Sequence, residues 1–97
     1  MKIIQSVKIG LQVTVIKQGK QFVAYAPALD ISTSGKTLKE AQKRFSELVN
    51  IFIDELIEKN TLEEVFTGLG WSKVKKQWEP PEIVSQKSVD IRLPVAA

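Results

Sequence analysis

The chain contains neither cysteine nor histidine among its 97 residues. Without cysteine, no disulfide framework supports a small secreted fold, and no thiol is present to act as a nucleophile. Without histidine, the chain lacks the side chain that most often serves as a general base or metal ligand near neutral pH. A serine nucleophile such as Ser32 or Ser34 would therefore have no neutral-range base to activate it.

Acidic residues are also scarce near the N-terminus, where Asp30 is the only aspartate or glutamate in the first 39 positions. A two-metal nuclease site needs several carboxylates that converge on ions about 4 Å apart. The next acids are expected on the polar face of a helix, pointing away from the sheet: Glu40, Glu47, Asp54, Glu55 and Glu58. We therefore expect no catalytic residue, metal site or cofactor, and interpret Asp30 as a loop or strand-edge carboxylate that accepts backbone amides.

Long apolar runs are missing as well, since none approaches the roughly 20 residues that a membrane helix needs. The apolar start is broken at Gln5 and Lys8, unlike the core of a signal peptide. With 43% hydrophobic and 26% charged residues, the composition is typical of one small globular domain. We expect a cytoplasmic protein without membrane contacts. The net charge of +3 is too mild to favour direct nucleic-acid binding.

The sequence predicts three strands in the first third of the chain. The first covers about 7–17, with one face made by Val7, Ile9, Leu11, Val13 and Val15. Gly19 supplies a hairpin turn, and a second strand over about 21–26 stops at Pro27, which cannot donate to a sheet. A third strand over about 29–33 precedes a turn at Gly35. Tight connections predict an antiparallel meander.

Two helices follow. Thr37 and Glu40 have the spacing of a capping box, and apolar residues then recur every three or four positions, which predicts a helix over about 38–59 that stops near Asn60. The sequence TLEE at 61–64 repeats the capping box and predicts a short helix over about 62–69, before Gly70. The stretch WSKVKKQWEPPE at 71–82 is interpreted as a loop.

The last element predicted is a strand over about 88–95, because Val89, Ile91, Leu93 and Val95 alternate with polar residues. A right-handed crossover through the long helix would place this strand beyond the first one. The predicted fold is therefore α+β, in the order β-β-β-α-(short α)-β. It has a four-stranded mixed sheet of order 3-2-1-4 that one long helix covers on one face.

The stretch YAPALDISTSGKTLKEAQKRF resembles the HicB-like antitoxins of toxin–antitoxin pairs. The features that carry the resemblance are a strand ending in proline, a short third strand, a glycine turn and a capped helix with an early Glu-Ala; here they are Pro27, Asp30–Ser34, Gly35, Thr37, Glu40 and Ala41. It continues through Trp78–Pro81 and the final VDIRLPV, and so covers nearly the whole chain. One departure is PALDIS, where the commoner family pattern reads Pro-Asp-Leu-Pro-Gly-Cys.

The resemblance implies a degraded ribonuclease-H-like fold and a defined partner. That partner is a HicA-like toxin, an mRNA-cleaving protein that the antitoxin would bind and occlude without catalysis. Many family members carry an additional helix-turn-helix or ribbon-helix-helix module that binds their own promoter. We expect no separate DNA-binding domain in residues 1–97, and no promoter binding by this chain alone.

Six residues are candidates for partner contact. The tryptophans Trp71 and Trp78 have two interpretations: they cover the edge of the core, which we favour, or they anchor a partner. The acids best placed to meet a basic toxin are Asp30, Glu79, Glu82 and Asp90.

Two further possibilities concern assembly and nucleic acid. A single helix on a small sheet would leave an apolar face open, which predicts a homodimer or higher homo-oligomer. The final strand could pair within its own chain, exchange between protomers or add to a partner's sheet. The alternative function is an orphan RNA-binding or regulatory module of the same fold, with Lys73, Lys75 and Lys76 as its basic cluster.

Overall fold

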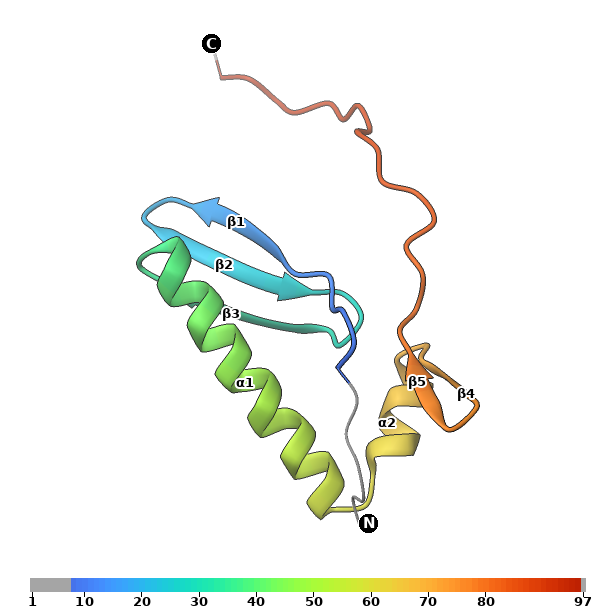
Figure 1. Cartoon of the computed structure of the whole chain (residues 1–97). Coiled ribbons are helices and arrows are strands. Elements are labelled where there is room, and N and C mark those ends of the chain that lie inside the picture. The colour runs from blue at the N-terminus through green and yellow to red at the C-terminus, as the bar shows by residue number, and fades with distance from the viewer. Residues whose placement is uncertain (1–7, 97) are drawn as a thin grey trace.

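The computed structural model describes residues 8–96 and has an α+β architecture with two antiparallel sheets (Figure 1). Strands β1 (Thr14–Gln18), β2 (Gln21–Ala26) and β3 (Ile31–Gly35) form the larger sheet. Helices α1 (Leu38–Glu58) and α2 (Leu62–Gly68) follow, and a hairpin of β4 (Ser72–Val74) and β5 (Gln77–Glu79) forms the second sheet. Residues 80–96, called here the C-terminal segment, form neither helix nor strand.

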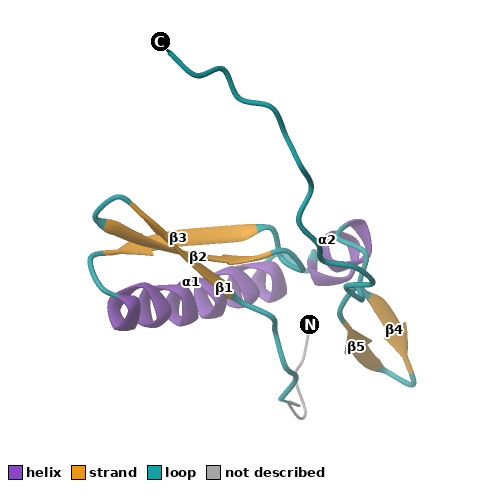
Figure 2. Cartoon of the chain, turned by 90° about the horizontal axis from the view of Figure 1, so that it is seen from above, coloured by secondary structure: helices purple, strands orange, loops and turns teal. Residues whose placement is uncertain are grey.

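The predicted meander forms in the order β1-β2-β3. Gly19 adopts a φ of 60° in the two-residue turn between β1 and β2. Val15, Ala24 and Thr33 are aligned across the three strands, so they share one face of the sheet. Helix α1 lies against this face (Figure 2), and its Phe45 is buried among the sheet residues.

Close packing of α1 on β3 depends on Gly35, which is buried. A Cβ atom built on Gly35 would lie 2.6 Å from the backbone nitrogen of Ala41. The absence of a side chain here therefore allows the first turn of α1 to approach the strand. Arg44 adds a polar link, since its Nη1 donates to the carbonyl of Ser34 at 3.2 Å.

Both ends of α1 follow from local chemistry. The Thr37 hydroxyl accepts a hydrogen bond from the Glu40 amide at 3.0 Å, as the capping box predicts. The Glu40 carboxylate pairs with Arg44 at 2.9 Å. At the other end Asn60 adopts a left-handed φ of 57°, and the Thr61 amide donates to the carbonyl of Leu56. This is the hydrogen-bonding pattern of a Schellman motif, in which asparagine takes the place of glycine.

Helix α2 ends in the same way. Gly70 has a φ of 92°, and the Trp71 amide donates to the carbonyl of Phe66 at 3.0 Å. The turn returns Trp71 onto Phe66, and these residues form a second core cluster with Leu29 and Leu56. The capping box predicted at Thr61 does not form, because the Thr61 side chain makes no capping hydrogen bond.

The predicted four-stranded sheet of order 3-2-1-4 is wrong. The strand expected over 88–95 is absent, and the C-terminal segment leads away from the rest of the chain (Figure 1). An alternating pattern defines two faces, but a strand also needs a neighbour to accept its backbone hydrogen bonds. Within the expected strand, Pro94 has no amide proton and can be accommodated only at an edge position or at the strand end.

Two other strand predictions need correction. Strand β1 begins at Thr14, which pairs with Tyr25, and residues 8–13 are not in a strand; Val7 lies outside the described residues. Because β2 ends before Pro27, residues 8–13, which precede β1, have no pairing partner in β2. The third strand begins at Ile31, because residues 27–30 form a turn in which Asp30 has a φ of 53°.

The stretch interpreted as a loop contains the β4–β5 hairpin. Its two-residue turn is made by Lys75 and Lys76, with φ angles of 50° and 65°. Two consecutive left-handed residues define a type I′ turn, which favours Asn-Gly or Gly-Gly and is uncommon for lysine. The sequence therefore contains no conventional sign of this hairpin.

The molecule is elongated, with principal extents of 62 × 29 × 21 Å and a radius of gyration of 16.9 Å. A compact domain of 97 residues is expected to have a radius of gyration of about 12.5 Å. The difference is explained by the C-terminal segment, which projects on the side of the sheet away from α1 (Figure 2). Within residues 8–96, no helix combines the length and the apolar character needed to cross a membrane.

Candidate interaction surface

Trp71 belongs to the core. Only 5% of its surface is exposed, its indole Nε1 donates to the carbonyl of Ala28 at 2.7 Å, and its ring centroid lies 4.6 Å from that of Phe66. This hydrogen bond spans 43 residues and attaches the end of α2 to the turn between β2 and β3. Trp71 therefore offers little surface to a partner.

Trp78 lies farther out, on strand β5, and is half-buried. Its ring meets Phe66 edge to face at 5.5 Å, and the Lys73 ammonium lies 5.6 Å from its ring centroid. Lys73 also approaches Glu63 of α2 at 3.9 Å. Both tryptophan rings thus contact Phe66, Trp71 within the core and Trp78 at its margin.

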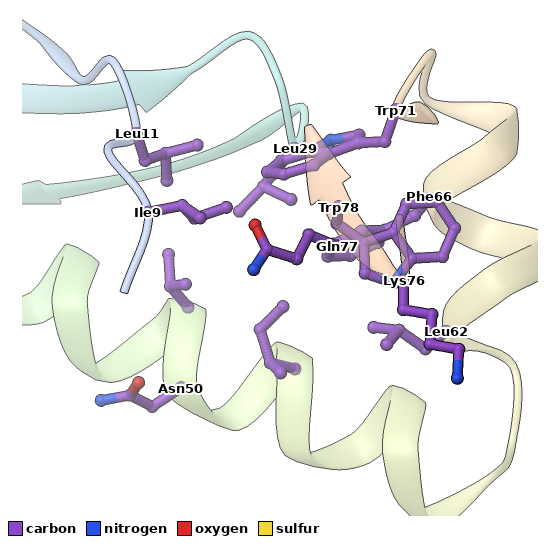
Figure 3. Close-up of a pocket in the computed structure, with 12 residues that line it drawn as sticks. Ile9, Leu11, Leu29, Asn50, Leu62, Phe66, Trp71, Lys76, Gln77 and Trp78 are labelled. Carbon is purple, nitrogen blue, oxygen red and sulfur yellow. The ribbon is translucent and has the colours of Figure 1, made fainter. Parts of the chain in front are cut away.

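A cavity of about 490 Å³ opens beside Trp78 (Figure 3). Ile9 and Leu11 lie on one side of it, and Phe66 and Trp78 on the other. Helix α1 contributes Val49, Asn50 and Ile53, and the hairpin contributes Lys76 and Gln77. The lining is mainly apolar, which is the general character of binding cavities.

Asp30 is a turn residue, as predicted, although its hydrogen-bond partner differs from the one expected. Its Oδ1 accepts from the Tyr25 hydroxyl at 3.1 Å. This hydrogen bond, together with the negative charge on Asp30, raises the pKa of Tyr25 above its ordinary value. Tyr25 lies on the face of the sheet opposite α1, because its neighbour Ala24 faces the helix.

That second face of the sheet is mixed in character. The register places Thr14, Tyr25 and Ser32 in one row and Ile16, Val23 and Ser34 in the next. Ile16 is 48% exposed, whereas the hydroxyl-bearing residues keep much of the face polar. The open apolar face on which the homodimer prediction depended is therefore only partly present.

The largest group of exposed apolar side chains lies in the C-terminal segment. Their exposed fractions range from about half to nearly complete: Ile83 49%, Val84 87%, Val89 72%, Ile91 74%, Leu93 72% and Val95 92%. The segment therefore presents apolar side chains that the rest of residues 8–96 leaves largely uncovered.

The three acids predicted near this segment are exposed and spread along it. Glu79 ends β5, Glu82 follows Pro81, and Asp90 lies between Val89 and Ile91. Glu82 also borders a hollow of about 550 Å³ between the proline pair, the β2–β3 turn and residues 10–14. The acids do not converge into one cluster. Within residues 8–96, no group of three or more acidic side chains is arranged to hold a metal ion.

Some residues of this surface were missed in the sequence. Phe66, which contacts both tryptophans, is one apolar position among several in α2, and only the Gly70 turn brings Trp71 onto it. Lys76 and Gln77 reach the cavity because the hairpin folds back, a turn that their sequence does not indicate.

Comparisons with protein families, with characterised proteins and with solved structures find no match to this chain.

Proposed function

We propose that the chain is an antitoxin of the HicB-like kind, which binds a HicA-like mRNA-cleaving toxin in the cytoplasm and occludes it without catalysis. The observation that carries the proposal is the exposed apolar C-terminal segment attached to a small folded body. At the start of this segment, close to β5, Val84 is 87% exposed and Ile83 is 49% exposed. Such a segment is suited to add to a partner's surface.

The meander and α1 also support the proposal. The resemblance implies a β-β-β-α arrangement with a capped helix after a glycine turn, and β1 to α1 have that order, with Thr37 as the cap. The final strand that the resemblance implies does not form in the single chain.

The toxin contact would be centred on β5 and the first residues of the segment. Trp78 offers a half-buried ring beside the apolar cavity, and Glu79 and Glu82 add exposed negative charge close by in the sequence. Half-buried tryptophans in such settings are common hot spots of binding. The net charge of +3 gives little electrostatic steering toward a basic toxin, so apolar contact would provide most of the affinity.

The test is co-expression with a HicA-like toxin encoded beside this chain, followed by co-purification and a growth assay. We expect a stable complex and protection of growth. The Trp78→Ala variant should weaken binding by at least about 2 kcal/mol, as hot-spot truncations do. Glu79→Lys reverses a charge in the proposed contact and should also weaken binding. Glu47→Lys makes the same charge change on the exposed side of α1 and is its control. Failure of the unchanged chain to bind or protect would reject the proposal.

A second candidate is an RNA-binding module, which the hairpin favours. Lys73 contacts the Trp78 ring, and Lys75 and Lys76 form the exposed tip of the same hairpin. A stacking ring beside positive charge is the usual way to hold a single-stranded base. This function predicts RNA affinity that falls steeply with salt and is lost in Lys75→Ala/Lys76→Ala; the toxin-binding function predicts neither.

A further inference from the structure

The sequence of the C-terminal segment is complementary to itself when two copies run in opposite directions. If Ile91 lies opposite Ile91 of a second copy, Val89 falls opposite Leu93, and Asp90 falls opposite Arg92. Alternation then places the apolar side chains on one face and the charged ones on the other. Both copies contribute equally, so the contact contains two Asp90–Arg92 pairs.

Other registers of the same pairing lack this match. Moving one copy by two residues keeps the apolar face but places Asp90 opposite Asp90, or Arg92 opposite Arg92. Like charges directly opposite each other destabilise a strand pair, and opposite charges stabilise it. Moving one copy by a single residue places apolar side chains opposite polar ones. The charges therefore select one register.

The position of Pro94 agrees with that register. Residues that face each other in an antiparallel pair alternate between hydrogen-bonded and non-hydrogen-bonded positions. If the two Ile91 residues form a hydrogen-bonded pair, Pro94 lies opposite Ser88 in a non-hydrogen-bonded pair. The missing amide proton of Pro94 is not needed there. Asp90 and Arg92 also lie in a non-hydrogen-bonded pair, where side chains approach most closely.

The structure leaves this segment free to pair. Its backbone is in neither helix nor strand, Ile91 is 74% exposed and Leu93 is 72% exposed. The segment also projects from the body on the side away from α1 (Figure 2), so neither α1 nor the hairpin obstructs a second copy. We propose that residues 88–94 of two chains pair as antiparallel strands about Ile91 and so join the protein into a homodimer.

This interface is separate from the proposed toxin contact and does not depend on the antitoxin assignment. It engages Asp90 with Arg92 of the second chain, whereas Trp78, Glu79 and Glu82 remain available to another partner. A two-stranded ribbon by itself is marginally stable in water, so we expect a dimer that dissociates on dilution.

The first experiment uses single cysteines in the full-length chain, which has none of its own. Ile91→Cys should form a covalent dimer under mild oxidation, because the two thiols meet at the centre of the pair. Val89→Cys is the control on the same face. The two copies of residue 89 would be about 14 Å apart, beyond the roughly 7 Å that a disulfide spans between Cα atoms. Equal crosslinking of both variants, or of neither, would overturn the proposal.

The second experiment reverses the charges and measures the dimer by analytical ultracentrifugation over a range of concentrations. Asp90→Arg should weaken the dimer about tenfold, because it replaces two attractive pairs with two repulsive ones. The double variant Asp90→Arg/Arg92→Asp restores both pairs with the order exchanged, and should dimerise like the unchanged chain. The pairing would be contradicted if the unchanged chain were monomeric at all concentrations. It would also be contradicted if the double variant dimerised no more strongly than Asp90→Arg.

Discussion

Strand β2 and the C-terminal segment both have apolar residues at every second position, yet only β2 is a strand. In β2, Ala24 and Ala26 are fully buried, with β1 and β3 on either side and α1 against one face. In the segment, Ile91 and Leu93 have the same spacing and remain largely exposed. The comparison shows that alternation defines which residues share a face, whereas the neighbours decide whether a strand exists.

The two regions should respond differently to the loss of an apolar side chain. Trp71→Ala removes a buried ring and its hydrogen bond to Ala28, and should lower the free energy of unfolding by about 3–5 kcal/mol. Leu93→Ala, in the segment, should change it by less than about 0.5 kcal/mol in a dilute sample. Urea denaturation measures both. If Trp71→Ala does not fold, Trp71→Phe should still show a loss of about 1 kcal/mol from the missing hydrogen bond.

The close packing of α1 against the sheet can be tested by adding a single methyl group at Gly35. Gly35→Ala places a methyl group 2.6 Å from the Ala41 backbone nitrogen, and should lower stability by about 1–3 kcal/mol. Gly68→Ala is the matched control, because nothing lies within 4 Å of its added Cβ and it occupies a helix. Alanine there should stabilise by up to about 1 kcal/mol. Equal effects at the two glycines would contradict the close approach of α1 to β3.

The two threonine caps provide a smaller contrast between the helices. Thr37→Ala removes the hydrogen bond to the Glu40 amide and should cost about 1 kcal/mol. Thr61→Ala should cost less, since the Thr61 side chain caps nothing. Thermal unfolding of both variants tests this order, and a larger loss at Thr61 would show that α2 is capped in another way.

The smallest effect expected is on the titration of Tyr25, the only tyrosine in the chain. Its neutral hydroxyl donates to Asp30, which raises its pKa, so the stability due to this bond is complete below pH about 10. That stability is lost as the pH rises through the higher pKa of the folded state. Tyrosinate absorbance should show a midpoint above 10 that falls in Asp30→Asn. A midpoint unchanged by that substitution would contradict the contact.

The sequence was sufficient to predict helix and strand ends that are determined by residues at those ends. Thr37 and Asn60 determine where α1 begins and ends, and Gly19 and Pro27 determine the extent of β2; each acts on its own backbone or the adjacent turn. The assignment of Asp30 to a turn depended on the same kind of evidence. These features need no knowledge of distant residues.

The errors concern features that depend on distant residues or on unusual turns. The strand predicted over 88–95 requires a neighbouring strand, and residues 8–96 do not provide one. The β4–β5 hairpin turns through Lys75 and Lys76, residues that rarely adopt left-handed angles, so turn chemistry gave no indication of it. The candidate site was predicted in part: Trp78 lies beside the cavity, whereas Phe66, which joins it to Trp71, has no distinguishing pattern in the sequence.

The central claim is that the C-terminal segment lies outside the folded body and is available to a partner. Amide hydrogen exchange of the full-length chain, read residue by residue in a dilute sample, tests this most directly. We predict strong protection of the paired amides of β2 and β3, and exchange near the unprotected rate for residues 82–93, with protection of 89–93 appearing only at high concentration. Protection of 89–93 equal to that of β1 in the dilute sample would contradict the account.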